Sequence, residues 1–229
     1  MNVRSSTAPP YRTREKHRLA LWFLLVGVLA VLQYAGRFSS GKPSAQTLYE
    51  WTTAIGTVIQ DGIILVLVLL IAKPRWDLLA LRRPKSIARA AGYVVVTLVA
   101  IYVFEGVYGA LTHPGNEQGL TPKHWESARA APYVVNALVI CTFVPFVEEL
   151  TYRGLGFSVV RPWGRWPTIL VVGLMFGLAH GLLVLLPVIV AFGCMLAWIR
   201  DRTDSVVPGM FAHGIFNLIA LVAAVAVSH

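Results

Sequence analysis

Residues 144–154 read VPFVEELTYRG and place Glu148, Glu149 and Arg153 inside an otherwise apolar stretch. An ionised side chain at the centre of a membrane-spanning helix costs roughly 2.5–3.5 kcal/mol, so three in six positions need a compensating role. In a helix, Glu149 and Arg153 are spaced i,i+4 and pair along one face, whereas Glu148 points about 100° away, towards Tyr152. Glu148 is therefore predicted to be a spare carboxylate suited to general-base chemistry, and the alternative is a structural ion pair at a helix end.

The composition indicates a membrane protein. Of the 229 residues, 56% are hydrophobic and only 14% charged, and the mean hydropathy is +0.65. A water-soluble domain of this size is less apolar, so we predict a multi-pass protein of the cell inner or plasma membrane, in contact with membrane lipid. The net charge of +9 comes from basic clusters between apolar runs, which is typical of membrane topology and argues against a nucleic-acid partner.

The apolar runs predict an all-α bundle of about seven transmembrane helices, within a range of six to eight. The runs cover residues 19–36, 51–72, 90–111, 133–160, 168–199 and 205–227. The fifth run is too long for a hydrocarbon core of about 30 Å, so we divide it into two short spans joined near residues 181–187. We expect residues 1–18 to form a flexible basic cytoplasmic tail and residues 19–229 a single integral-membrane domain.

The basic residues also predict the orientation of the helices. They gather in the tail, in residues 73–89, in residues 161–165 and in residues 200–202, whereas the other loops hold few. Because basic loops stay on the cytoplasmic side of a membrane, we predict a cytoplasmic amino terminus and an outer carboxyl terminus.

Five other residues stand out within the apolar runs. Asp61 and Glu105 are expected to face protein or a cavity, either as supporting groups of a site or, as we favour, in interhelical hydrogen bonds. Cys141 and Cys194 are predicted to be buried thiols that act as small apolar side chains. Pro145 is expected to kink its helix just before the two glutamates.

Two further motifs place histidines inside apolar runs. Phe176 and His180 are spaced i,i+4, and so are His213 and Asn217. A lone intramembrane histidine also bonds a backbone carbonyl, so either motif alone is weak evidence. Counted from the basic ends of their helices, however, Glu149, His180 and His213 all lie roughly 12–18 Å deep. This common level predicts a polar cavity that is reached from the cytoplasm.

Taken together, the three motifs resemble those of the CPBP family, also called the CAAX protease and bacteriocin-processing or Abi family, which includes the type II CAAX prenyl endopeptidases. The motifs, in chain order, are Glu148-Glu149-x-x-x-Arg153, Phe176-x-x-x-His180 and His213-x-x-x-Asn217. The resemblance covers about residues 140–220, and the first three spans match only as generic helices.

The resemblance implies an intramembrane endopeptidase that cuts near the cytoplasmic membrane face. Glu148 and His180 would activate a water for attack on a peptide carbonyl, and His213 with Asn217 would stabilise the oxyanion. The supporting residues would be Glu149, Arg153 and Phe176. The implied partner is a peptide or protein substrate, with lipid-modified or membrane-anchored substrates included.

The cofactor prediction is a metal-free, glutamic-type mechanism. The family has often been described as metalloproteases, and the alternative is zinc held by Glu148, His180 and His213. The sequence contains no HExxH motif, however, and no Glu-x-x-His pair. It also lacks the G-x-S-x-G motif of a serine hydrolase.

Two other functions remain open from the sequence. The first is a non-catalytic membrane scaffold or bacteriocin-immunity factor of the same family. The second is a proton-coupled transporter that uses Asp61, Glu105 and Glu148 as a relay, which we rank last because no inverted repeat is visible.

Overall fold

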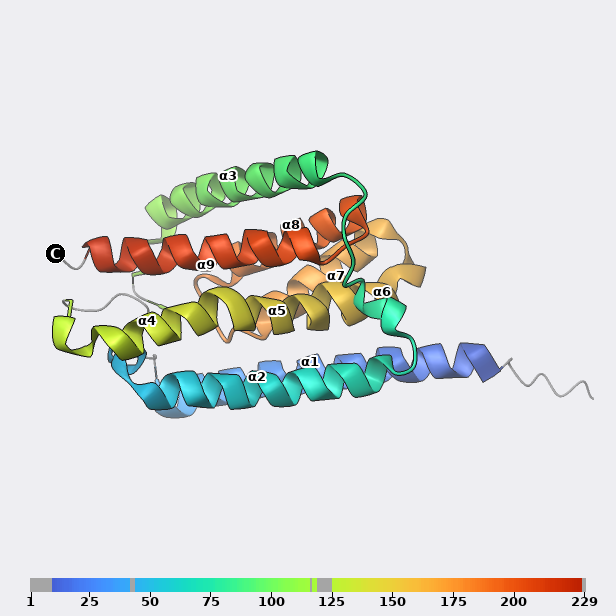
Figure 1. Cartoon of the computed structure of the whole chain (residues 1–229), viewed down its shortest axis with the longest axis horizontal. Coiled ribbons are helices and arrows are strands. Elements are labelled where there is room, and N and C mark those ends of the chain that lie inside the picture. Colours follow the sequence, from blue (N-terminus) through green and yellow to red (C-terminus); the bar gives the residue numbers. More distant parts are fainter. Residues whose placement is uncertain (1–9, 42–43, 116, 119–124, 228–229) are drawn as a thin grey trace, which may run out of the picture.

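The computed structural model describes residues 10–41, 44–115, 117–118 and 125–227, and the regular structure within them is entirely helical. The long helices lie side by side with their axes roughly aligned (Figure 1). The separate helices are α1 (Pro10–Ser40), α2 (Trp51–Ala72), α3 (Ile87–Thr112), α7 (Arg165–Leu178), α8 (Leu186–Thr203) and α9 (Val207–Val227). The rod from Ala130 to Val160 joins α4 (Ala130–Leu138), η4 (Val139–Phe143), α5 (Val144–Glu149), η5 (Leu150–Gly156) and α6 (Phe157–Val160). The predicted helical membrane bundle is confirmed.

Short 3₁₀ turns complete the regular structure of the described residues. They are η1 (Ala45–Tyr49), η2 (Trp76–Leu79), η3 (Ser127–Arg129) and η6 (Arg161–Trp163).

Five helical segments of the described chain are long and apolar enough to cross a membrane. They are Glu15–Ser39, Trp51–Ala72, Ile87–Thr112, Ser127–Trp163 and Val207–Ala226. The run 168–199 is divided as predicted, because α7 ends at Leu178 and α8 begins at Leu186. With 14 residues, α7 is only about 21 Å long. It therefore ends inside the bundle and carries its last residues into the interior.

Helix α1 begins at Pro10 and so extends into the segment predicted to be a tail. Arg18, which is almost fully buried, pairs with Glu15 at 2.8 Å. Its guanidinium also donates to the carbonyl oxygens of Ile71 and Lys73, both at 3.1 Å. Arg18 thus satisfies carbonyls that the end of α2 leaves without donors, which anchors the basic part of α1.

The rod from Ala130 to Val160 contains two π-helical segments, η4 and η5, on either side of Pro145. Proline has no N–H, so a regular α-helix through it would leave a carbonyl one turn earlier without a donor. The wider π-helical hydrogen bond from Val144 N to Val139 O absorbs this defect. The kink predicted at Pro145 therefore takes the form of a widened helical turn next to the two glutamates.

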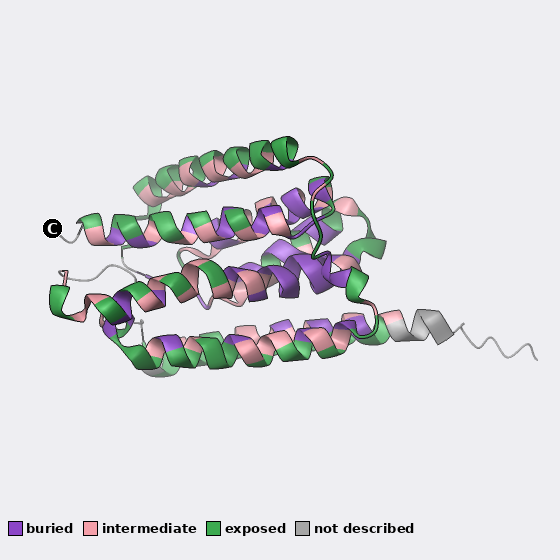
Figure 2. Cartoon of the chain, in the orientation of Figure 1, coloured by how far each residue is buried: buried purple, intermediate pink, exposed green. Residues whose placement is uncertain are grey.

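The buried residues gather in the half of the bundle nearer to the start of α1 (Figure 2). There Trp22 is fully buried and its indole N–H donates to the Thr151 carbonyl at 2.9 Å. Its ring occupies the space beside Gly156, where a Cβ atom would lie 2.4 Å from the indole. This core fills the end of the bundle that carries the basic loops.

The loop between α2 and α3 closes the same end. Val206 N donates to the Ala80 carbonyl at 3.1 Å, the Ser205 hydroxyl donates to the Arg82 carbonyl, and Arg82 pairs with Asp204 at 2.6 Å. The α8–α9 turn is thereby fixed to residues 80–82. These contacts close the basic end of the bundle.

The close contact between α7 and α8 depends on glycine. A Cβ atom on Gly173 would lie 2.4 Å from Cys194 Sγ and 2.7 Å from Cys194 N. We predict that Gly173→Ala destabilises the protein by about 1–3 kcal/mol, because the two helices must move apart. The measurement is the thermal unfolding midpoint of the purified protein in detergent.

Gly92→Ala in α3 is the matched control, because a Cβ there meets nothing within 4 Å. It should leave the midpoint unchanged or raise it, since alanine stabilises a helix by about 0.5–1 kcal/mol relative to glycine. An unchanged midpoint for Gly173→Ala would contradict the close packing.

Candidate active site

A cavity of about 580 Å³ lies between α1, α2, the rod from Ala130 to Val160, the α7–α8 connection and α9. The four residues predicted to be catalytic all line it, and they come from three separate parts of the fold. They are Glu148, His180, His213 and Asn217. The structure therefore brings together the side chains that the sequence placed at one depth.

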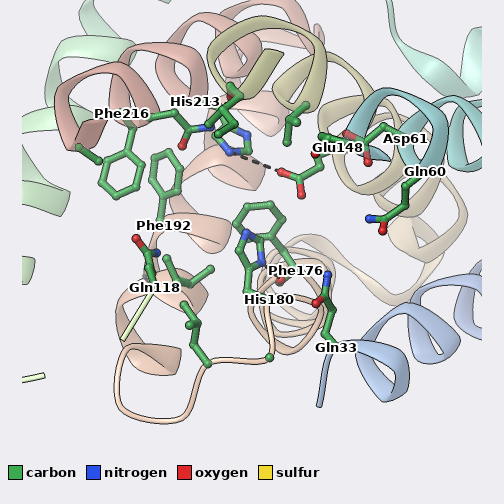
Figure 3. A pocket seen from close by; sticks show the side chains of 18 of the residues that line it. Gln33, Gln60, Asp61, Gln118, Glu148, Phe176, His180, Phe192, His213 and Phe216 are labelled. Atoms are coloured by element: carbon green, nitrogen blue, oxygen red, sulfur yellow. Dashed lines mark hydrogen bonds and ion pairs between the residues drawn. The ribbon is translucent and has the colours of Figure 1, made fainter. Parts of the chain in front are cut away.

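Glu148 projects from α5 into the cavity and faces His213 of α9 (Figure 3). Glu148 Oε2 lies 3.5 Å from His213 Nε2, and the other ring nitrogen of His213 lies 3.4 Å from Glu149 Oε1. The imidazole is thus held between two carboxylates while being only 3% exposed. Glu148 Oε2 is buried and makes no hydrogen bond within the described residues, so the His213 ring is its charged neighbour.

His180 lies just beyond the end of α7, and its Nδ1 is 2.7 Å from the Phe176 carbonyl oxygen. A carbonyl oxygen only accepts, so Nδ1–H donates and Nε2 carries the lone pair. The Phe176 ring, 4.5 Å from the His180 ring and 5.6 Å from that of His213, separates the two imidazoles. His180 therefore presents a hydrogen-bond acceptor, whereas the His213 ring lies between two carboxylates.

Glu149 and Arg153 form the predicted i,i+4 pair, with 2.8 Å between Oε1 and Nη1 and neither side chain exposed. Arg153 Nη2 also donates to the Gly193 carbonyl of α8 at 3.0 Å. Its guanidinium lies 4.2 Å from the centre of the Phe176 ring of α7. The pair supports the site by fixing the rod against both neighbouring helices.

Asn217 Nδ2 donates to the Ile140 carbonyl at 2.8 Å. This carbonyl belongs to η4, the widened turn before Pro145. One helical turn earlier on α9, a Cβ atom on Gly214 would lie 2.5 Å from the Cys141 carbonyl oxygen. The irregular backbone thus orients the Asn217 amide, and the second N–H of that amide is left for the cavity.

Some of the residues that line the cavity are exposed on one flank of the bundle. The exposed lining residues include Gln33, Gly36 and Gly41, from the carboxyl-terminal end of α1, and Gln60 of α2. These residues lie towards the end of the bundle opposite the basic loops, whereas the basic end is filled by the core. Counting depth from the basic ends gave a common level, but it could not reveal which end was packed. The predicted entry from the cytoplasm depends on the orientation of the bundle in the membrane, and both stay predictions.

Of the two acidic residues in other spans, only Asp61 is a lining residue. It is 6% exposed, and its Oδ2 makes no hydrogen bond within the described part of the chain. The favoured interhelical hydrogen bond is thus absent at this oxygen. Glu105 is half-buried on α3, which packs on α8 and α9. The two thiols, Cys141 and Cys194, are partly buried and free.

Sequence reasoning missed Glu117, which is 2% exposed. Glu117 Oε1 pairs with Arg37 at 2.7 Å and accepts from the N–H groups of Leu183 and Val184 at 2.9 and 3.2 Å. Its Oε2 accepts from Leu185 N at 2.7 Å. Glu117 therefore caps the amino terminus of α8 and ties it to α1 near the rim of the cavity. This partnership joins distant segments, so no local sequence pattern could reveal it.

No group of three His, Cys, Asp or Glu side chains in the described residues is arranged to hold a metal ion. Of the three residues of the zinc alternative, Glu148 and His213 lie 3.5 Å apart, and His180 holds its Nδ1 against the Phe176 carbonyl. The metal-free mechanism stays a prediction, and we derive no step through a metal.

We predict that the stability supplied by Glu117 depends on pH. Burial alone would raise its pKa, but the three backbone N–H donors and Arg37 outweigh burial and hold the pKa below its ordinary value of 4.5. A lowered pKa stabilises the fold above the ordinary value, and this stability is lost as the pH falls through the lowered pKa. Glu117→Gln should therefore reduce the free energy of unfolding at pH 7 by about 1.5–3 kcal/mol.

The measurement is thermal unfolding of both proteins from pH 7 downwards. The difference should shrink below pH 4.5 and vanish at lower pH, where the wild-type carboxyl is also neutral. Glu50→Gln is the control, because Glu50 is exposed and its replacement should change stability by less than about 0.5 kcal/mol. A constant difference at every pH would contradict the role of the Glu117 charge.

Comparison with known proteins gives one family. Residues 130–219 match the family model described as type II CAAX prenyl endopeptidase Rce1-like. The curated proteins contain no match, and the solved structures contain none. The matched residues run from the start of α4 into α9 and hold every predicted catalytic residue, whereas α1, α2 and α3 lie outside them. The resemblance found in the motifs is therefore confirmed over residues 130–219: this part of the chain is similar to the type II CAAX prenyl endopeptidases, which are proteases.

Proposed function

We propose that the protein is an intramembrane endopeptidase that hydrolyses a peptide bond with a water activated by Glu148. The observation that carries this proposal is the convergence of Glu148, His180, His213 and Asn217 on one cavity. The match of residues 130–219 to an endopeptidase family supports it. A scaffold or a transporter would not require a carboxylate, two imidazoles and an amide at one point.

Glu148 is the general base in this proposal. The Glu148 carboxylate, which lines the cavity, accepts a proton from a water whose oxygen attacks the substrate carbonyl. His180 Nε2 accepts the second hydrogen bond of the same water, because Nδ1 is already used as a donor to the Phe176 carbonyl. The two acceptors fix the orientation of the nucleophile.

His213 and Asn217 stabilise the oxyanion. The carboxylates of Glu148 and Glu149 lie beside the two nitrogens of His213 and hold the ring in place. Asn217 adds its second N–H while Ile140 holds the first. Donors fixed in advance lower the barrier most, and removal of one typically slows catalysis by about 100- to 1,000-fold.

The substrate enters from the rim formed by α1 and α2. Its exposed amides, Gln33 and Gln60, lie in membrane-spanning segments at the end opposite the basic loops. With the basic loops in the cytoplasm, cleavage then takes place in a cavity open to the other side. A lipid-modified or membrane-anchored peptide is the substrate class that reaches such a rim from the bilayer.

We predict that Glu148→Gln lowers peptide cleavage by at least about 100-fold, because glutamine keeps the shape but accepts no proton. The protein is purified, reconstituted in lipid nanodiscs and supplied with internally quenched peptides, both with and without a prenylated cysteine. Peptide termini that appear only in membranes with the wild-type protein identify further substrates.

Glu105→Gln is the matched control, since Glu105 is an intramembrane carboxylate outside the cavity, and it should retain wild-type activity. Wild-type cleavage by Glu148→Gln would remove the assigned base. A cellular phenotype that survives Glu148→Gln, with no cleavage by either protein, would favour the scaffold or immunity function.

We also predict that activity survives a strong zinc chelator, because the polar groups of the cavity supply both the base and the oxyanion donors. The measurement is the initial cleavage rate before and after chelation, with zinc added back to a third sample. Lasting inhibition that is reversed by zinc would contradict the metal-free mechanism and favour the zinc alternative.

A further inference from the structure

Asp61 is a second carboxyl group in the catalytic cavity, and it comes from α2, outside the residues that match the protease family. Figure 3 shows it on the same side of the cavity as Glu148. Its side chain is 6% exposed, whereas the adjacent Gln60 is exposed at the rim. Helix α2 packs directly on α5 and η5, which places Asp61 against the part of the rod that carries Glu148.

A purely structural role does not account for Asp61. A buried carboxyl that stabilises a membrane protein needs a cation or hydrogen-bond donors. Asp61 Oδ2 is buried and has no hydrogen-bond partner among the described residues. Arg37, which lines the same cavity, pairs with Glu117, and Arg153 of the rod pairs with Glu149. Each buried and unpartnered polar group costs about 1–3 kcal/mol, so its presence here calls for a functional explanation.

Peptide hydrolysis needs a proton donor as well as a base. The water must lose a proton, and the leaving nitrogen must gain one, because an amide anion is too basic to leave. Asp61 of α2 and Glu148 of α5 line the same cavity. Two carboxylates that face one water-poor site repel each other, and a single shared proton relieves that repulsion. One carboxylate then acts as the base while the other holds a proton.

We propose that Asp61 is a further catalytic residue, the acid that protonates the leaving amine. The inference rests on the proposed peptidase function. Water forms the new C–O bond and gives its proton to Glu148. The C–N bond then breaks, and its electron pair takes the proton of the Asp61 carboxyl, which releases a carboxylic acid and an amine. Proton transfer from Glu148 to Asp61 restores the starting state.

The test compares an amide with an ester. One internally quenched peptide that the wild-type protein cleaves is made in two forms, with an amide or an ester at the scissile bond. An alkoxide leaves without prior protonation, so only the amide needs the acid. Asp61→Asn should lower amide cleavage by about 100- to 10,000-fold and ester cleavage by less than about 10-fold. Glu148→Gln should lower both, because both reactions need activated water.

Two variants keep the result interpretable. Asp61→Glu retains a carboxyl group in the cavity and should cleave the amide faster than Asp61→Asn does. Glu105→Gln should cleave both substrates at the wild-type rate, and thermal unfolding confirms that each variant is folded. An equal loss of amide and ester cleavage in Asp61→Asn would overturn the acid role, and so would an unchanged amide rate.

The two hypotheses fail in different ways. If Glu148→Gln cleaves both substrates like the wild type, the proposed peptidase site is wrong whatever Asp61 does. If Glu148→Gln is inactive and Asp61→Asn cleaves the amide normally, only the role of Asp61 is wrong.

Discussion

The buried ion pair of Glu149 and Arg153 is the interaction on which the catalytic half of the bundle depends. Neither side chain is exposed, so each charge must be compensated by the other or by fixed dipoles. Arg153 also binds the Gly193 carbonyl of α8 and covers the Phe176 ring of α7. Glu149 lies so close to α9 that a Cβ atom on Gly209 would be 2.4 Å from its Oε2. One pair thereby sets the spacing of four helices, and the spacing aims Glu148 into the cavity.

Backbone irregularity has a second organising role. Pro145 removes one N–H from the rod, and the widened turn of η4 leaves the Ile140 carbonyl to the Asn217 amide. A regular helix would have used that carbonyl internally. The defect thus becomes the hydrogen bond that orients a site residue from another helix. Such π-helical turns often occur at functional sites, and here the irregular backbone and the polar cluster are in direct contact.

The sequence predicted the bundle and the membership of the site because both follow from strong local signals. Long apolar runs specify membrane helices, and charged residues inside them require partners. Pairings between distant segments could not be predicted from the sequence. The partners of Glu117 lie on α1 and before α8, so it appeared as an ordinary loop residue. Asp61 was expected to face protein or a cavity, but its position in the same cavity as Glu148 depends on how α2 packs. The open end of the cavity depends on core packing, which periodicity does not report.

Gln33 and Gln60 bear on how a substrate of the proposed reaction reaches the cavity. Both are exposed on membrane-spanning helices at the edge of the cavity, where hydrocarbon tails offer no partners for their amides. Lipid therefore leaves these two amides without partners on this flank. In the proposed peptidase, they are free to bind the backbone groups that a membrane-embedded helical substrate exposes when it unwinds before cleavage.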